Sequence, residues 1–473
     1  MKCLLGLFFL YFSVSSHVSS EVFYLDPKTG SLSNDGSVNS PLPSLQDVLS
    51  ANLIKGYSRK VPFNWQTGVE ELEILNPAGV INEGDTLILN SGFHGDISIK
   101  NIINSKKIEI KAGLNQKPVI GTLSVIGSRH WIFEGLTIDF SQSKLVRPRG
   151  DYLVFIENHK FFGPASDIEI NNNKIFSDTD ANEWSAEDWK IFAFGGIRAN
   201  ANNISIKRNS VTNTSFGISG EGKNTVIKKN RIFNFSGDAI RALGDNSIVE
   251  SNIVANSIKV DDNHDDGFQS WAPNSEKALN NLIIRNNVFY TKCNHPNEAL
   301  LSNYQGIGLF DGFYNNVVIE NNILYLNHWH AITILGGNNV TIMHNTIVDP
   351  NPNDEMDPWI KVAAHKNGQV GTENSIYNNI SKVIFDQPGV DYKNNIFIQP
   401  DDYTNVFQDH KSFDFRIKDN SIVVDRGSSN NTVLLHNFDI ESNQRDNYPD
   451  LGAIELMSDN NTSVSHINCS SDG

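Results

Sequence analysis

The 473-residue chain is poor in several features on which common protein functions depend. Its three cysteines are too few for a disulfide framework. No Cys/His spacing typical of a zinc site occurs, and no serine elbow of the hydrolase type. Charged residues make up only 19% of the chain, and their balance is a net −16. That acidity disfavours a nucleic-acid partner, whose phosphates would be repelled, but a local basic groove would still accept an acidic sugar polymer.

Long apolar runs are also scarce. The one pronounced run lies at the N-terminus, where Lys2 precedes apolar residues and small residues follow up to Ser20. This pattern predicts a secretory signal peptide over 1–20. No later run is long enough to span a membrane. We therefore expect a secreted protein, extracellular or periplasmic, with no membrane span, working as a monomer.

What the chain has in abundance is a repeat that starts near residue 165. Short alternating stretches recur in the form x-φ-x-φ-x-x-N-x-φ, where φ is apolar, as in "DIEINNNKIF", "NTVIKKNRIF" and "NLIIRNNVFY". Alternation turns one set of side chains inward and the other outward. The Asn at the turn tolerates left-handed backbone geometry and can bond its equivalents in adjacent coils.

A second strand precedes each of these stretches. Its apolar residues are 21, 22, 28, 39 and 25 positions apart and are Ile197, Ile218, Ile240, Phe268, Ile307 and Ile332. A basic coil of 21–25 residues with loop insertions is typical of a parallel β-helix, whereas propeller blades need about 40 residues or more. The sequence thus predicts an all-β, right-handed parallel β-helix (a solenoid) with long loop insertions.

The domain plan follows from the same repeat. An amphipathic stretch over 41–56 predicts a helix that caps the N-terminal end of the solenoid. We expect one β-helix domain over 21–457 and a polar tail over 458–473.

Two segments carry a family resemblance. "VFYLDPKTGSLSNDGSVNSPLPSLQDVL" (22–49) resembles the first segment of secreted right-handed β-helix proteins of the pectate-lyase-like superfamily. "FDFRIKDNSIVVDRG" (413–427), followed by "DNYPDLGAIE" (446–455), resembles their C-terminal closure. The resemblance covers nearly the whole mature chain. It implies a carbohydrate-active protein, because the superfamily contains polysaccharide lyases, glycoside hydrolases, uronan epimerases and non-enzymatic adhesins.

The coil alignment predicts which side chains meet, since equivalent positions of successive coils lie about 4.8 Å apart. One outward column should hold Arg198, Ser219, Arg241, Gln269, Gly308, Thr333 and Lys361. A second should hold Asp238, Asp266, Gln305 and His330. Sugar sites combine groups for proton transfer with hydrogen-bonding groups and rings to stack on. The predicted catalytic residues are His264, Asp266, Arg241, His330 and Lys361. The predicted substrate-binding residues are Gln269, Trp271, Tyr304, Gln305 and Arg198.

A divalent cation is a further possibility at this acidic stretch. "DDGFQSW" (265–271) resembles a motif of one pectate lyase family in which aspartates hold Ca²⁺. The resemblance implies calcium ligands at Asp265 and Asp266, and Asp238, expected beside Asp266, is a third candidate ligand because Ca²⁺ takes several oxygen ligands at loose geometry. Gln269 replaces a third family aspartate, and no basic residue occurs over 308–310, where that family places its catalytic lysine.

These residues favour a secreted enzyme that cleaves a polysaccharide, most simply one containing uronate, by β-elimination. Three alternatives stay open: a glycoside hydrolase that uses Asp238 and Asp266 as an acid and base pair, a uronan C5-epimerase, and a non-catalytic carbohydrate-binding adhesin.

Overall fold

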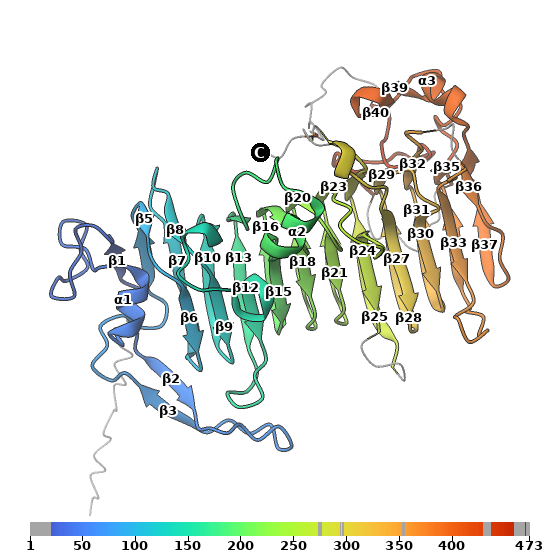
Figure 1. Ribbon diagram of the computed structural model, residues 1–473. Coiled ribbons are helices and arrows are strands. Elements are labelled where there is room, and N and C mark those ends of the chain that lie inside the picture. Colours follow the sequence, from blue (N-terminus) through green and yellow to red (C-terminus); the bar gives the residue numbers. More distant parts are fainter. Residues whose placement is uncertain are drawn as a thin grey trace, which may run out of the picture.

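In the computed structural model the chain winds through three long parallel sheets, each coil contributing one strand to each sheet (Figure 1). The structure describes residues 20–272, 277–293, 295, 298–351, 355–428, 437–457 and 469. The predicted signal peptide and most of the predicted tail lie outside these residues. Strands that are neighbours in one of these sheets are three strands apart in sequence, because each turn of the solenoid passes once through each sheet. The fold is the predicted right-handed parallel β-helix.

The first sheet, here the long sheet, has fifteen strands. Thirteen follow one path: β1 (Val22–Leu25), β4 (Thr86–Leu89), β7 (Ile103–Ala112), β10 (Arg129–Glu134), β13 (Ser166–Asn171), β16 (Asn202–Lys207), β19 (Val226–Lys228), β22 (Ile248–Glu250), β25 (Leu279–Arg285), β28 (Tyr314–Glu320), β31 (Gly337–Met343), β34 (Asn374–Tyr377) and β37 (Val390–Lys393). The hairpin of β2 (Gly56–Arg59) and β3 (Leu72–Leu75) joins it at β7.

The second sheet has twelve strands and follows the first around each coil. Its strands are β5 (Gly92–Phe93), β8 (Pro118–Ile120), β11 (Thr137–Asp139), β14 (Lys174–Phe176), β17 (Ser210–Thr214), β20 (Arg231–Phe235), β23 (Ile253–Ser257), β26 (Val288–Tyr290), β29 (Ile323–Tyr325), β32 (Thr346–Val348), β35 (Ile380–Ser381) and β38 (Ile396–Phe397).

The third sheet, here the eleven-stranded sheet, carries the predicted site columns. Its strands are β6 (Ile97–Lys100), β9 (Leu123–Ile126), β12 (Tyr152–Glu157), β15 (Gly195–Asn200), β18 (Ile218–Gly220), β21 (Ile240–Ala242), β24 (Asp266–Trp271), β27 (Gln305–Asp311), β30 (His330–Leu335), β33 (Trp359–Ala363) and β36 (Val383–Ile384).

The helices are short and lie outside the sheets. They are α1 (Leu45–Ser50), α2 (Ala186–Phe192) and α3 (Tyr403–Val406), with single 3-10 turns η1 (Phe140–Gln142), η2 (Arg149–Asp151), η3 (Glu298–Leu300), η4 (Pro400–Asp402) and η5 (His410–Ser412). Helix α1 lies at the N-terminal end in Figure 1 and buries Leu45 and Val48. It has only six residues, and its role as an end cap stays a prediction. Within the described residues no helix has the length and apolarity to cross a membrane.

The repeated x-φ-x-φ-x-x-N-x-φ stretch forms two strands joined by a tight turn. In the coil of β13 and β14, Asn172 takes the left-handed conformation (φ 54°) and Asn173 follows with its side chain buried. The backbone of Asn173 is not left-handed. The sequence analysis expected one Asn to take the left-handed conformation and to bond its equivalents in adjacent coils, but these two properties belong to neighbouring residues. The left-handed position also accepts Arg208, Lys229, Ser251 and His344 in other coils.

The second position of this turn builds an interior ladder of asparagines. The Oδ1 atom of each member accepts both the backbone N–H and the amide N–H of the member one coil before it, at 2.8–3.0 Å. Each buried amide is therefore satisfied by its neighbours, which buried polar groups require. The members are Asn173, Asn209, Asn230, Asn252, Asn287, Asn322, Asn345, Asn379 and Asn395.

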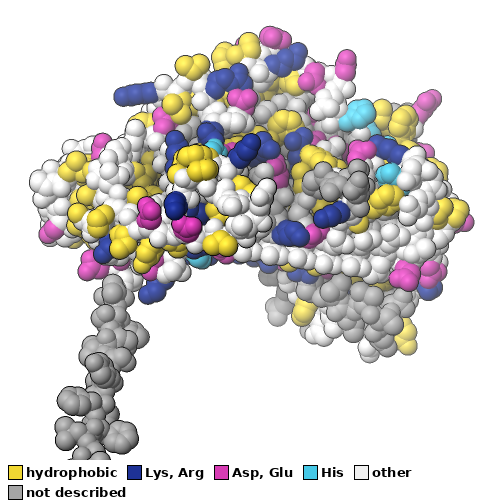
Figure 2. Space-filling model, turned by 90° about the horizontal axis from the view of Figure 1, so that it is seen from below, with side chains coloured by type: hydrophobic (Ala, Val, Ile, Leu, Met, Phe, Trp, Pro, Cys, Tyr) yellow, Lys and Arg dark blue, Asp and Glu magenta, His cyan; other side chains and the backbone are white. Residues whose placement is uncertain are grey.

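The C-terminal segment packs over the twelve-stranded sheet. The antiparallel pair β39 (Phe407–Asp409) and β40 (Asp414–Ile417) forms with α3 a layer there, seen at the upper right of Figure 1. Phe415, Leu451 and Ile454 belong to one apolar cluster with Tyr290 and Ile323 of that sheet. A disulfide joins Cys293 to Cys469 and ties this end of the chain to the middle coils. Seen from below, the elongated body carries charged side chains of both signs along its length (Figure 2).

Candidate active site

The outward column predicted on the eleven-stranded sheet is confirmed by the strand register. Arg198 pairs with Ser219, Ser219 with Arg241, and Arg241 with Gln269. Gln269 pairs with Gly308, Gly308 with Thr333, and Thr333 with Lys361. Lys361 falls in register even though the insertion over 351–358 interrupts the rhythm of the repeat. The sequence therefore determined which side chains are neighbours on this face.

Asp238 and Asp266 meet as predicted, but they are not exposed. They are 2% and 1% accessible to solvent. Each lies three residues before a member of the outward column and reaches it from beneath: Arg241 Nε donates to Asp238 Oδ2 at 2.6 Å, and Gln269 Nε2 donates to Asp266 Oδ2 at 3.0 Å. The expectation of a second exposed column was wrong here, because Asp238 and Asp266 lie two residues before the inward residues Ile240 and Phe268, and residues two apart in an extended chain face the same side.

The two residues are joined by a bond from the backbone of one to the carboxyl group of the other. The backbone N–H of Asp266 donates to Asp238 Oδ1 at 3.2 Å. Burial raises the pKa of Asp238, although Arg241 opposes this shift. Burial, and then the negative charges of Asp238 and Asp265, hold the pKa of Asp266 well above its usual value. Two negative charges placed this close oppose each other's ionisation, and of the two residues Asp266 has the pKa that is raised more.

Arg241 is held between two aromatic rings. Its guanidinium carbon lies 4.1 Å from the ring centre of Phe216 and 5.4 Å from that of Trp271. Together with the bond to Asp238, these contacts fix the guanidinium at the surface of the sheet. The sequence analysis named Trp271 for this face and missed Phe216, which the spacing of the repeat would have placed one coil before Asp238.

Asp265 points away from the pair. Its Oδ2 atom accepts hydrogen bonds from Ser257 Oγ at 2.5 Å and Ser302 Oγ at 3.3 Å. Burial raises the pKa of Asp265 to about 6, and the two serines oppose the shift. Consecutive residues of an extended chain face opposite ways, which separates Asp265 from Asp266.

The three predicted calcium ligands therefore do not converge. Both oxygens of Asp238 are already engaged, Asp265 bonds elsewhere, and Arg241 places a positive charge beside the only remaining carboxyl. No group of three or more His, Cys, Asp or Glu that would hold a metal occurs within the described ranges. This donor set fits Ca²⁺ poorly, and no step below uses a metal; the calcium requirement itself stays a prediction.

Three histidines gather at the other side of Gly308. His330 Nδ1 lies 3.0 Å from Thr333 Oγ1, which also accepts from Trp359 Nε1 at 3.0 Å. Burial, and then the charges of Lys361 and His264, lower the pKa of His330 to about 4. Burial, His330 and His264 likewise hold the pKa of His328 at about 4. Both buried imidazoles are thus neutral at pH 7, and His264 is exposed beside them.

Aromatic rings line this end of the sheet. Phe310 covers the bare backbone of Gly308, where an added Cβ would come within 2.2 Å of its ring, and it contacts His330 edge to face at 5.2 Å. Lys361 lies over Phe385 at 5.3 Å. Neither Phe310 nor Phe385 was named from the sequence, because a ring at an outward position looks the same in sequence as one that covers the core.

Two predicted binding residues do not act as expected. Tyr304 is 1% exposed and lies in the main core, where its hydroxyl donates to the carbonyl of Tyr290 at 3.0 Å; the prediction that it stacks on sugar was wrong. Arg198 is exposed, but Glu221 neutralises it through two bonds of 2.6 and 3.1 Å. Gln305 pairs with Asp266 in register and is only 6% exposed.

Comparison with known proteins bears on the fold. No family model matches the chain, and no curated protein does. A GH136 lacto-N-biosidase from Eubacterium ramulus aligns with 80% of this chain and 68% of its own at 14% identity and a TM-score of 0.41. A rhamnogalacturonan lyase aligns over 83% and 92% at 13% identity and a TM-score of 0.41. A PL6 family alginate lyase aligns over 67% and 48% at 15% identity and a TM-score of 0.40. At these identities and TM-scores, no family and no residue role is carried over from these proteins to this chain.

Proposed function

We propose that the chain is a carbohydrate-active enzyme that cleaves a uronate-containing polysaccharide by β-elimination. The observation that supports this proposal is the set of side chains on either side of Gly308 on the eleven-stranded sheet, where the ring of Phe310 lies over the bare backbone. Arg241 and Gln269, with the buried carboxyl of Asp266 beneath Gln269, lie on one side of Gly308, and His330 lies on the other. A sugar ring resting on Phe310 contacts the guanidinium and the amide on one edge and a neutral imidazole on the other.

The donor side is suited to a carboxylate. Arg241 supplies a fixed guanidinium, Gln269 an amide, and protonated Asp266 an O–H. The proton on the carbon beside a uronate carboxylate becomes removable only when the negative charge that develops there is stabilised. These groups stabilise it without adding a free anion to the site, because Asp266 is neutral and Asp238 is paired.

His330 is the proposed base. Thr333 Oγ1 can accept from both His330 Nδ1 and Trp359 Nε1, which leaves Nε2 of His330 as the acceptor. The C5 proton passes to Nε2, the C5–H electron pair forms the C4–C5 double bond, and the C4–O bond breaks. The departing oxygen takes a proton from exposed His264 or from solvent, and His330 returns its own to solvent.

The hydrolase alternative rests on the raised pKa of Asp266, which suits a general acid. Its partner is less suited, since both oxygens of Asp238 are bonded, one to the guanidinium of Arg241 and one to the backbone N–H of Asp266. A hydrolase needs its second carboxylate free to act on water or on the sugar. These bonds therefore favour elimination.

The deciding experiment incubates the purified protein with a panel of polyuronates and measures both unsaturated sugar, by ultraviolet absorbance, and new reducing ends. Elimination gives both, and His330→Gln should abolish both while the matched surface variant Lys174→Ala keeps them. Reducing ends without unsaturation would show a hydrolase. Exchange of the C5 proton without cleavage would show an epimerase, and binding alone an adhesin. A chelator arm tests the calcium requirement.

A further inference from the structure

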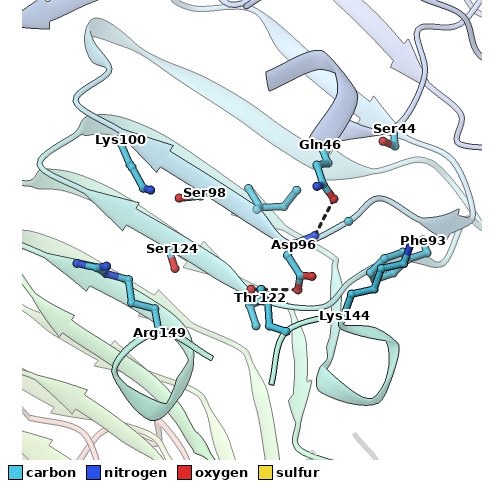
Figure 3. A pocket seen from close by; sticks show the side chains of 13 residues that line it. Ser44, Gln46, Phe93, Asp96, Ser98, Lys100, Thr122, Ser124, Lys144 and Arg149 are labelled. Atoms are coloured by element: carbon cyan, nitrogen blue, oxygen red, sulfur yellow. Dashed lines mark hydrogen bonds between the residues drawn. The ribbon is translucent and has the colours of Figure 1, made fainter. Parts of the chain in front are cut away.

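A pocket of about 600 Å³ lies on the same sheet face as the candidate site, near the N-terminal end of the solenoid (Figure 3). Strands β6 and β9 form its floor with Ser98, Lys100 and Ser124, and the loop before β12 adds Lys144 and Arg149. Its volume is in the range of small-ligand sites. No residue of the candidate active site lines it.

The pocket is basic although the chain is acidic. Three cations line it against one carboxylate, Asp96, within a chain whose net charge is −16. Asp96 is engaged, since it accepts from Thr122 Oγ1 at 3.2 Å. Among the described residues, Lys100 and Lys144 have no ion-pair partner, whereas Arg149 donates to Glu157 at 2.5 Å. The two lysines are therefore available to an anion from outside the chain.

The floor is polar as well as charged. In Figure 3, Ser98 and Ser124 lie between Lys100 and Arg149, and Asp96 and Thr122 lie at the opposite side near Lys144. Hydroxyls beside cations match a ligand that carries both hydroxyl and carboxylate groups. A simple inorganic anion would need only the cations.

The pocket and the candidate site belong to one column. Ser98 pairs with Ser124, Ser124 with Phe155, and Phe155 with Arg198, from which the column continues to Arg241. Five coil steps of about 4.8 Å each separate Ser98 from Arg241, or about 24 Å in all. An extended polymer lying along the face reaches both places at once.

We propose that this pocket is a distal binding subsite for a carboxylate-bearing sugar unit of the same chain that is cleaved near Gly308. The proposal rests on the proposed function for its choice of ligand. It assigns acidic groups of the polymer to the cations at the two sides of the pocket, Lys100 at one and Lys144 at the other, and sugar hydroxyls to the two serines between Lys100 and Arg149. Its consequence is a preference for long chains, because binding at the second place becomes intramolecular once the first is occupied.

The test measures binding without turnover. In a His330→Gln background, calorimetry compares a long polyuronate with its disaccharide, before and after Lys100→Ala/Lys144→Ala. We expect the double substitution to weaken binding of the long chain about tenfold and to leave binding of the disaccharide at the candidate site unchanged. The matched control is Lys174→Ala/Lys229→Ala, which removes two exposed lysines from other faces and should change neither.

Two results would overturn the subsite. One is equal affinity for the long chain with and without Lys100 and Lys144. The other is competition by inorganic sulfate as effective as that by the polymer, which would make the pocket a small-anion site. Failure of the elimination reaction leaves this binding difference measurable, so the two proposals fail separately.

Discussion

The backbone N–H of Asp266 donates to Oδ1 of Asp238 at 3.2 Å, and this bond joins consecutive coils at the point where the candidate site is most deeply buried. Arg241 Nε donates to the other carboxylate oxygen of Asp238, Oδ2, at 2.6 Å. The pair therefore holds one compensated negative charge and one proton. A neutral acid beside a fixed guanidinium is the feature on which the proposed chemistry depends.

Asp266→Asn tests that proton. The substitution keeps the shape and a donor but removes the acid, so we expect kcat/KM to fall by about 10²-fold or more. Stability at pH 7 should hold or rise, because a buried carboxyl with a raised pKa is replaced by a neutral amide. Turnover assays and urea unfolding measure the two effects, with Asp262→Asn on the exposed loop as the control. Full activity in Asp266→Asn would remove this residue from the mechanism.

The fall in kcat/KM at low pH should reflect protonation of His330. Its pKa of about 4 means that the imidazole is neutral and able to accept a proton above that pH. We expect kcat/KM on polyuronate to rise with pH through about 4 and then to level. Substitution of Lys361 by Met removes a charge that lowers this pKa, so the rise should move to higher pH. A rise that stays in place would show that Lys361 does not act on the base.

Asp265 should make stability depend on pH. Its pKa is about 6 in the folded chain against a usual 3.8, so the folded state binds the proton more tightly. Stability is therefore highest below pH 4 for this group and falls as pH rises to about 6, by at most roughly 3 kcal/mol. Asp265→Asn should flatten that part of the profile, measured by denaturant unfolding between pH 4 and 7. An unchanged slope would assign the dependence to another group.

Trp271 and Tyr304 should separate binding from stability. Trp271→Ala removes a ring beside Arg241, so we expect KM to rise several-fold with little loss of stability. Tyr304→Phe removes a buried bond to the Tyr290 carbonyl and should lower stability by about 1 kcal/mol without changing KM. Kinetics and thermal unfolding on both variants check the pair. The reverse assignment would mean that the ring of Tyr304 reaches substrate.

The buried asparagine ladder should contribute more to the free energy of unfolding than the ladder nearer the surface. Asn252→Ala leaves the amide partners in two coils unsatisfied, so we expect a loss of about 2–4 kcal/mol. Asn315 bonds its neighbours in a similar ladder that faces solvent, and Asn315→Ala should cost less than about 1 kcal/mol. Urea unfolding of the two variants provides the comparison. Equal losses would mean that burial does not set the strength of the ladder.

Much of this fold was predictable because a solenoid repeats one local pattern. The spacing of the repeat in the sequence alone predicts that Arg241 lies beside Gln269 and Thr333 beside Lys361, and the strand register agrees. The turn Asn was recognised as a bonding residue, although the left-handed position is its neighbour. Periodicity determines sequence neighbours well because every coil obeys the same geometry.

The spacing of the repeat did not determine how deeply each side chain is buried. Asp238 and Asp266 were expected on the exposed face, and Tyr304 was expected to stack on sugar, yet all three are buried. Asp238 and Asp266 each lie two residues before an inward residue, Ile240 and Phe268, so alternation itself turns them to the interior. Phe310 was missed because a ring at an outward position looks the same in sequence as one that covers the core, and Phe216 was missed although the spacing of the repeat places it one coil before Asp238.

The interior ladder also decides where a host cell could attach sugar to this chain. Asn379 begins the sequence Asn-Ile-Ser, a glycosylation acceptor pattern, but it is fully buried. Its amide donates to Ile342, Tyr377 and Asn395, so no hydrogen is left for a glycan bond. Asn339, in Asn-Val-Thr, lies on the surface instead. A glycan added to Asn379 before folding would have to displace a rung, whereas one on Asn339 would extend into solvent from the completed coil.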